Sequence, residues 1–123
     1  MRLTQDDRGL NFVIRSFSES HVTVNDQQLQ QSFLLTPENL ESEIPVEDLD
    51  DLEKHGESLL LRDDPEVVLI GTGSRTRMGP SALSALLMRQ GVGIEYMDTA
   101  AALRTYTVLA SELRRVSLLV IFQ

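Results

Sequence analysis

The sequence contains no cysteine, which excludes disulfide bonds, thiolate metal sites and a cysteine nucleophile. Tryptophan is also absent and aromatic residues make up only 5% of the 123 residues, so the core must rest on aliphatic side chains. No apolar run approaches the roughly 20 residues that span a bilayer. The first residues turn acidic at Asp6 and Asp7, unlike a signal peptide. These absences predict one cytoplasmic domain over residues 1–123, without membrane insertion.

Basic residues are also few, because 11 lysines and arginines face 19 acidic residues and leave a net charge of −8. The imbalance is uneven: residues 1–70 hold 16 acidic and 5 basic residues, whereas residues 71–123 hold 3 acidic and 6 basic ones. Nucleic-acid binding depends on neutralising phosphates, so we expect no nucleic-acid partner. The basic C-terminal half still allows a local anion site.

The first third of the chain has the apolar alternation of β-strands. This alternation over 10–17 and again over 21–24 predicts two strands. Asn25 and Asp26 follow, and both residue types tolerate the left-handed dihedrals of a tight turn. The segment 27–35 then predicts the returning strand of an antiparallel hairpin.

An acidic segment comes next, with nine acidic residues and one lysine between Glu38 and Glu57. Apolar residues recur at helical spacing over 46–52 and predict a short helix that ends at His55 and Gly56. A short extended piece is expected at 59–61. The acidic segment from Glu38 to Glu57 is either a solvated face or a docking surface for a basic partner, because apolar residues interleave with its acidic residues.

The C-terminal half alternates strands and helices. The pattern predicts a buried strand over 67–70, a loop over 71–79, a helix from Pro80 to Gly91, a strand over 94–97, a helix from about residue 100 and a strand over 116–122. Asp98 or Thr99 suits the cap of the second helix. This order predicts an α/β fold, a single domain with a mixed β-sheet flanked by helices and an N-terminal antiparallel hairpin.

The loop from Gly71 to Gly79 is a candidate anion site, because open α/β sheets bind ligands beyond the carboxyl ends of their strands. Arg75 and Arg77 would point the same way in an extended stretch, next to a helix N-terminus. The predicted ligand-binding residues are Gly71, Thr72, Gly73, Arg75, Arg77, Asp98 and Thr99. Thr76 stands where the dinucleotide fingerprint needs a third glycine, and the Gly-Lys of a P-loop is missing. The structural alternative is a surface turn followed by a helix cap at 98–99.

A second polar set lies in and after the last predicted helix, namely Arg104, Thr105, Tyr106, Glu112 and Arg114. It either forms ion pairs at the helix–strand junction or lines a polar pocket beside residues 71–73, with Tyr106 facing the core. The two histidines, His21 and His55, show no spacing of a Ser-His-Asp triad or a metal site. The sequence therefore predicts no catalytic residue, no metal and no cofactor.

Four motifs occur in order in the C-terminal half: Val67-Val68-Leu69-Ile70-Gly71-Thr72-Gly73, Gly91-Val92-Gly93-Ile94-Glu95-Tyr96-Met97-Asp98-Thr99, Ala102-Leu103-Arg104-Thr105-Tyr106, and Glu112 with Arg114-Arg115-Val116. Over residues 66–120 the chain resembles the family catalogued as domain of unknown function 498, the Mth938-like proteins. The resemblance implies a mixed sheet flanked by helices with extra N-terminal strands. A eukaryotic relative is an assembly factor for mitochondrial respiratory complex I, which implies an assembly role by fold-level analogy.

Two positions depart from the family pattern. Thr107 stands where the family usually has asparagine, and Leu113 stands where it usually has glycine. If position 113 is a left-handed helix end, leucine costs roughly 1–2 kcal/mol relative to glycine. Roles that relatives assign to that asparagine and glycine do not carry over to this chain.

These observations favour a non-enzymatic protein-interaction or assembly-factor-like domain with an unidentified protein partner. The acidic amphipathic segment and the family resemblance support this interpretation. The alternative is a small-molecule anion-binding protein or unrecognised enzyme that uses the loop from Gly71 to Gly79.

Overall fold

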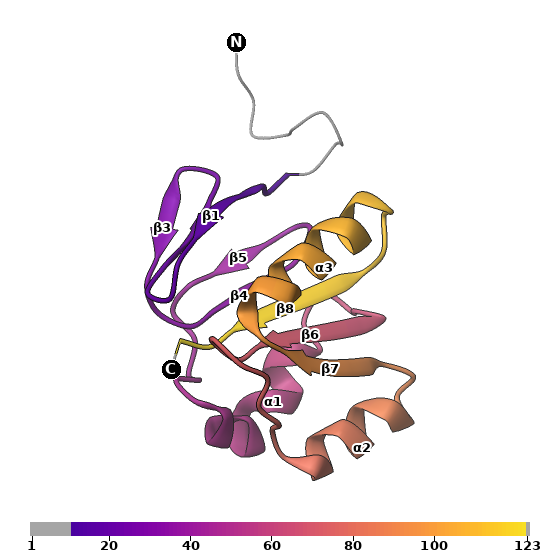
Figure 1. Ribbon diagram of the computed structural model, residues 1–123. Coiled ribbons are helices and arrows are strands. Elements are labelled where there is room, and N and C mark those ends of the chain that lie inside the picture. Colours follow the sequence, from indigo (N-terminus) through magenta and orange to yellow (C-terminus); the bar gives the residue numbers. More distant parts are fainter. Residues whose placement is uncertain (1–10, 123) are drawn as a thin grey trace.

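The computed structural model describes residues 11–122, which form two β-sheets and three α-helices (Figure 1). The smaller sheet is antiparallel and has the order β1-β2-β3, with β1 at Ile14–Phe17, β2 at Val22–Val24 and β3 at Gln27–Leu29. Asn25 takes φ 52° in the turn between β2 and β3, which confirms the predicted left-handed turn. Leu10, the first residue of the predicted strand, lies outside the described residues.

The larger sheet has the order β5-β4-β8-β6-β7 and is mixed, as predicted. Its strands are β4 (Phe33–Leu35), β5 (Leu40–Glu41), β6 (Val67–Gly71), β7 (Gly93–Met97) and β8 (Val116–Val120). Strands β8, β6 and β7 run parallel, whereas β4 pairs antiparallel with β8 and β5 pairs antiparallel with β4. Every residue of β8 is buried, because the strand is central and both of its faces are covered.

Helices cover both faces of the larger sheet (Figure 1). The helix α3 (Thr99–Ser111) and the small sheet enclose one core, whereas α1 (Leu52–Leu60), its preceding 3-10 turn η1 (Leu49–Asp51) and α2 (Ser81–Arg89) enclose the other. Strand β6 serves both cores, since Leu69 belongs to the first and Val68 and Ile70 to the second. This alternation follows from the two-residue period of a strand.

Three local predictions are wrong. The segment 27–35 is not one strand, because it divides into β3 and β4, which belong to different sheets. The first helix does not end at His55 and Gly56, and residues 59–61 are its C-terminal turn instead of an extended piece. Gly56 lies inside α1 because α2 packs on it: a Cβ there would come within 2.9 Å of Leu83 Cδ2.

Candidate functional site

The carboxyl ends of β6 and β7 form the crevice where a ligand site was predicted. The chain leaves β6 for α2 on one face of the sheet and leaves β7 for α3 on the other, which is the arrangement that opens a crevice in α/β sheets. The segment after β6 and the start of α3 are hydrogen-bonded to each other: Thr99 N donates to Gly73 O (2.8 Å), and Gly73 N donates to Thr99 Oγ1 (2.8 Å). Asp98 accepts from Ala101 N (2.9 Å) and caps α3, as predicted.

A cavity of about 290 Å³ adjoins this crevice, and it is lined in part by Gly73, Asp98 and Thr99. Glu19, from the turn between β1 and β2, is a second carboxylate in its wall, whereas Arg75 and Arg77 do not line it. Thr72 holds the loop, because its hydroxyl donates to Arg75 O (2.7 Å) and accepts from Arg77 N (3.1 Å). The structure thus joins residues 73, 98 and 99 and places both exposed arginine side chains outside the cavity, and an anion site there stays a prediction.

The second predicted polar set is divided in the structure. Arg104, Thr105 and Tyr106 lie along α3, whereas Glu112 and Arg114 follow its C-terminus, at the amino ends of β6 and β8 and therefore away from residues 71–73. Tyr106 is buried in the core, as expected, whereas Arg104 and Glu112 are exposed. Arg114 Nε donates to Glu66, and Arg115 Nη1 lies 3.8 Å from the same carboxylate. The hydrogen bond from Arg114 holds the pKa of Glu66 below its ordinary value.

Helix α3 ends in the left-handed conformation that the sequence suggested. Leu113 has φ 64°, and its amide donates to Ala110 O (3.0 Å). Arg114 N donates to Leu109 O (3.0 Å), which completes the hydrogen-bond pair of a Schellman helix end. Glycine usually occupies the left-handed position of this motif, and the leucine side chain is 87% exposed here.

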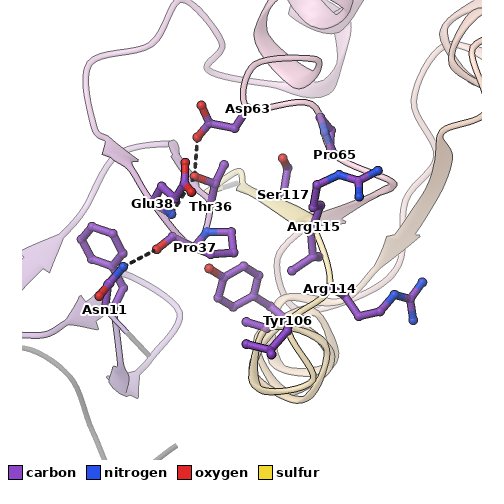
Figure 2. A pocket seen from close by; sticks show the side chains of 14 residues that line it. Asn11, Thr36, Pro37, Glu38, Asp63, Pro65, Tyr106, Arg114, Arg115 and Ser117 are labelled. Carbon is purple, nitrogen blue, oxygen red and sulfur yellow. Dashed lines mark hydrogen bonds between the residues drawn. The ribbon is translucent and has the colours of Figure 1, made fainter. Parts of the chain in front are cut away.

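A cavity of about 310 Å³ lies beside this helix end, and we call it the α3-end cavity (Figure 2). Four chain segments meet around it. It is lined by Asn11, Phe12, Thr36, Pro37, Glu38, Asp63, Pro65, Tyr106, Ala110, Leu113, Arg114, Arg115, Val116 and Ser117. One part of its wall is apolar and the rest carries hydroxyl, carboxylate and guanidinium groups.

Thr36 and Asp63 form a hydrogen-bond network in the cavity wall. Thr36 Oγ1 donates to Asp63 Oδ2 (2.6 Å), and Asn39 Nδ2 donates to the same oxygen (2.9 Å). These two bonds, with that of Asn39 as the larger contribution, lower the pKa of Asp63, so the carboxylate is charged at neutral pH. Asp63 and Asp64 have φ 61° and 51°, a left-handed pair that turns the chain from α1 toward β6.

One buried hydroxyl group in this wall has no hydrogen-bond partner among the described residues. Ser117 is 1% exposed, and its Oγ is fully buried without a partner. Tyr106 lines the same cavity, and burial raises the pKa of its hydroxyl. In Figure 2 the Ser117 oxygen points toward the space between Asp63 and Pro65.

Sequence reasoning did not find this cavity, because Thr36, Asp63 and Ser117 lie in three distant segments. The register Leu35↔Leu118, continued by one residue, brings Thr36 across from Ser117. One signal was present in the sequence: Ser117 interrupts an otherwise apolar strand, Val116-Ser117-Leu118-Leu119-Val120. A polar residue inside a strand that is buried on both faces needs a partner.

Within residues 11–122, no three His, Cys, Asp or Glu side chains are grouped to hold a metal ion. His21 Nδ1 lies 2.8 Å from Ser18 Oγ inside an exposed turn that is closed by Ser18 N donating to His21 O. His55 lies on α1, away from both cavities described above. In the same part of the chain, no helix is both long and apolar enough to cross a membrane.

The fold and the cavity together define a small mixed α/β domain with a partly polar cavity at the amino ends of β6 and β8. The chain belongs to the family described as protein of unknown function DUF498/DUF598, whose model matches residues 14–121. This membership confirms the family resemblance read from the four C-terminal motifs.

Among relatives, the chain is 30% identical over 82 residues to the "13 kDa major membrane protein" of Francisella tularensis subsp. holarctica. The aligned residues make up 67% of each protein. An NMR structure of a Xanthomonas campestris protein is 39% identical, with a TM-score of 0.78 over 99% of this chain and 92% of that one. A Mth938-like domain of Bordetella pertussis is 25% identical, with a TM-score of 0.76 over 99% and 92%. These similarities confirm the Mth938-like fold.

Proposed function

We propose that this protein is a non-enzymatic protein-interaction domain that docks a partner segment on the α3-end cavity. The observation that carries the proposal is Leu113, which combines a left-handed backbone with an 87% exposed apolar side chain at the rim of that cavity. A left-handed leucine costs roughly 1–2 kcal/mol, and an exposed side chain recovers nothing by burial. Strained residues of this kind cluster at binding sites, where a partner covers them.

The walls of the cavity support a partner segment that is both apolar and basic. Phe12, Pro37 and Ala110 continue the apolar surface of Leu113. The exposed carboxylate of Glu38 begins the acidic segment, and it lies on the same cavity. Arg114 and Arg115 also line the cavity, but both pair with Glu66, so the acidic segment that begins at Glu38 is the part of this surface that favours a basic partner.

The titratable groups of the cavity support binding rather than catalysis. Burial keeps the Tyr106 hydroxyl protonated at neutral pH, so it can donate a hydrogen bond but cannot act as a base. Asp63 already accepts two hydrogen bonds on one oxygen, which lower its pKa and its basicity. These groups favour recognition of a polar or charged group on the partner.

The experiment is site-specific photo-cross-linking with p-benzoylphenylalanine at position 113, compared with position 108. Val108 is the matched control, because it is an exposed apolar residue of the same helix that does not line the cavity. We expect a cross-link from position 113 to one polypeptide, at a segment rich in lysine or arginine and apolar residues, and little cross-linking from position 108. Equal yields at the two positions, or an acidic captured segment, would contradict the proposal.

A further inference from the structure

The outer face of helix α2 is apolar and basic. The residues of α2 that are exposed are Ser81, Ala82, Ala85, Met88 and Arg89. Met88 is 69% exposed, and Met78, three residues before the helix, is 72% exposed. No acidic residue occurs between positions 72 and 94, whereas three arginines do. Two exposed thioethers at the ends of one helix favour a protein contact, because methionine adapts its shape to a facing surface.

The neighbouring helix α1 carries the opposite charge. It lies beside α2 on the same face of the larger sheet (Figure 1), where a Cβ at Gly56 would come within 2.9 Å of Leu83 Cδ2. Glu53 and Glu57 of α1 are exposed, and they belong to the acidic segment, in which nine acidic residues accompany the single Lys54. One face of the molecule therefore presents an acidic strip and a basic, apolar strip side by side.

The opposite charges of the two helices do not pair with each other inside the chain. Among residues 11–122, the ion pairs involve Arg62, Arg114 and Arg115, and none joins α1 to α2. The exposed charges of both helices are thus open to a second molecule. Two adjacent strips of opposite charge are complementary to a copy of themselves that is rotated by a two-fold axis running along the groove between the helices.

We propose that two copies of this chain form a dimer in which α1 of each copy lies on α2 of the other. A foreign partner would have to bring its own acidic surface, whereas a second copy carries one directly beside α2. The contact is isologous, so it closes at two copies. No residue of α2 lines the α3-end cavity, and the dimer therefore leaves that docking surface open.

The test is sedimentation velocity of the full chain over a hundredfold range of concentration, in about 0.15 M salt, where screening over about 8 Å damps repulsion between the net charges. We expect the mean mass to rise toward twice 13.8 kDa and no further. Arg75→Glu/Arg89→Glu and, separately, Glu53→Arg/Glu57→Arg should each weaken self-association at least about tenfold, because like charges then face each other. The matched control Arg15→Glu, at an exposed arginine of β1, should leave self-association unchanged.

An equimolar mixture of the two charge-reversed variants tests the pairing of the helices. In a mixed pair, each reversed helix faces a helix of opposite charge, so the mixture should form a dimer that neither variant forms alone. Circular dichroism and melting temperatures establish that each variant is folded.

A second measurement leaves all the charges unchanged. Because the chain has no cysteine, Gln90→Cys places a nitroxide label at a single site just beyond α2. Mixed with the 15N-labelled unmodified chain, it should broaden the amide signals of residues 52–60 and leave those of residues 108–112 unchanged.

A mass of 13.8 kDa at every concentration would overturn the dimer and leave the outer face of α2 to an acidic segment of another protein. A mass that grows beyond two copies would overturn the two-fold contact. Self-association that persists in both charge-reversed variants, or a mixture of folded variants that stays monomeric, would overturn the pairing of α1 with α2.

Discussion

Replacing Ser117 by alanine should stabilise the protein when no partner is bound. The substitution removes a buried hydroxyl that has no hydrogen-bond partner within residues 11–122 and leaves the rest of β8 unchanged. A buried unsatisfied polar group costs about 1–3 kcal/mol, whereas the lost oxygen takes only a few weak packing contacts with it. We therefore expect the free energy of unfolding to rise by about 1 kcal/mol. For a domain of this size that corresponds to a melting temperature about 3–5 °C higher.

The assay is urea unfolding followed by circular dichroism, with a thermal melt as a second measurement. Ser16→Ala is the matched control, because Ser16 is an exposed strand residue and its replacement tests the change in strand propensity alone. The control should stay within about 0.5 kcal/mol of the parent protein. If Ser117→Ala instead lowers the free energy of unfolding by more than that margin, the hydroxyl makes a stabilising hydrogen bond and the reasoning is refuted.

Four further predictions follow from the same contacts. Leu113→Gly should raise the free energy of unfolding by about 1–2 kcal/mol in urea, because it relieves the left-handed leucine, and an unchanged midpoint would contradict this. Thr99→Val removes the acceptor that joins the loop after β6 to α3 and should cost about 1–3 kcal/mol in the same assay; a neutral effect would show that the loops hold together without it. The lowered pKa of Asp63 stabilises the protein above the unfolded-state pKa and is lost as pH falls through the folded value, so urea midpoints from pH 7 to pH 3 should fall less for Asp63→Asn than for the parent, and parallel curves would refute the assignment. If the loop binds an anion, a phosphate- or nucleotide-induced rise in melting temperature should disappear in Arg75→Ala/Arg77→Ala, whereas a rise that persists would place the anion elsewhere.

The sheet of the C-terminal half was predictable because its signals are local. The apolar run at 67–70 and the capping residue Asp98 give β6 and the start of α3, and Gly91 has the positive φ of 79° expected after α2. The left-handed position of Leu113 was also within reach, since a family pattern with glycine marks a backbone requirement. Each of these signals depends on a few neighbouring residues.

The failures all depend on contacts between distant segments. The end of α1 was misplaced because Gly56 is used for close packing on Leu83, which sequence periodicity does not record. The α3-end cavity was missed because cross-strand register brings Thr36 near Ser117 and a left-handed turn adds Asp63. Periodicity along the chain gives the face of each strand but not the register between strands.

Hydrogen–deuterium exchange on the unmodified chain, free and mixed with the partner segment that cross-linking identifies, is the most direct test of the docking surface. We predict slower exchange on binding at residues 33–38, 61–66 and 112–117, which surround the α3-end cavity. Exchange should be unchanged at residues 72–75 and 98–100, in the crevice at the carboxyl ends of β6 and β7. Protection confined to the crevice, with no change around Leu113, would contradict the account and assign binding to the loop after β6.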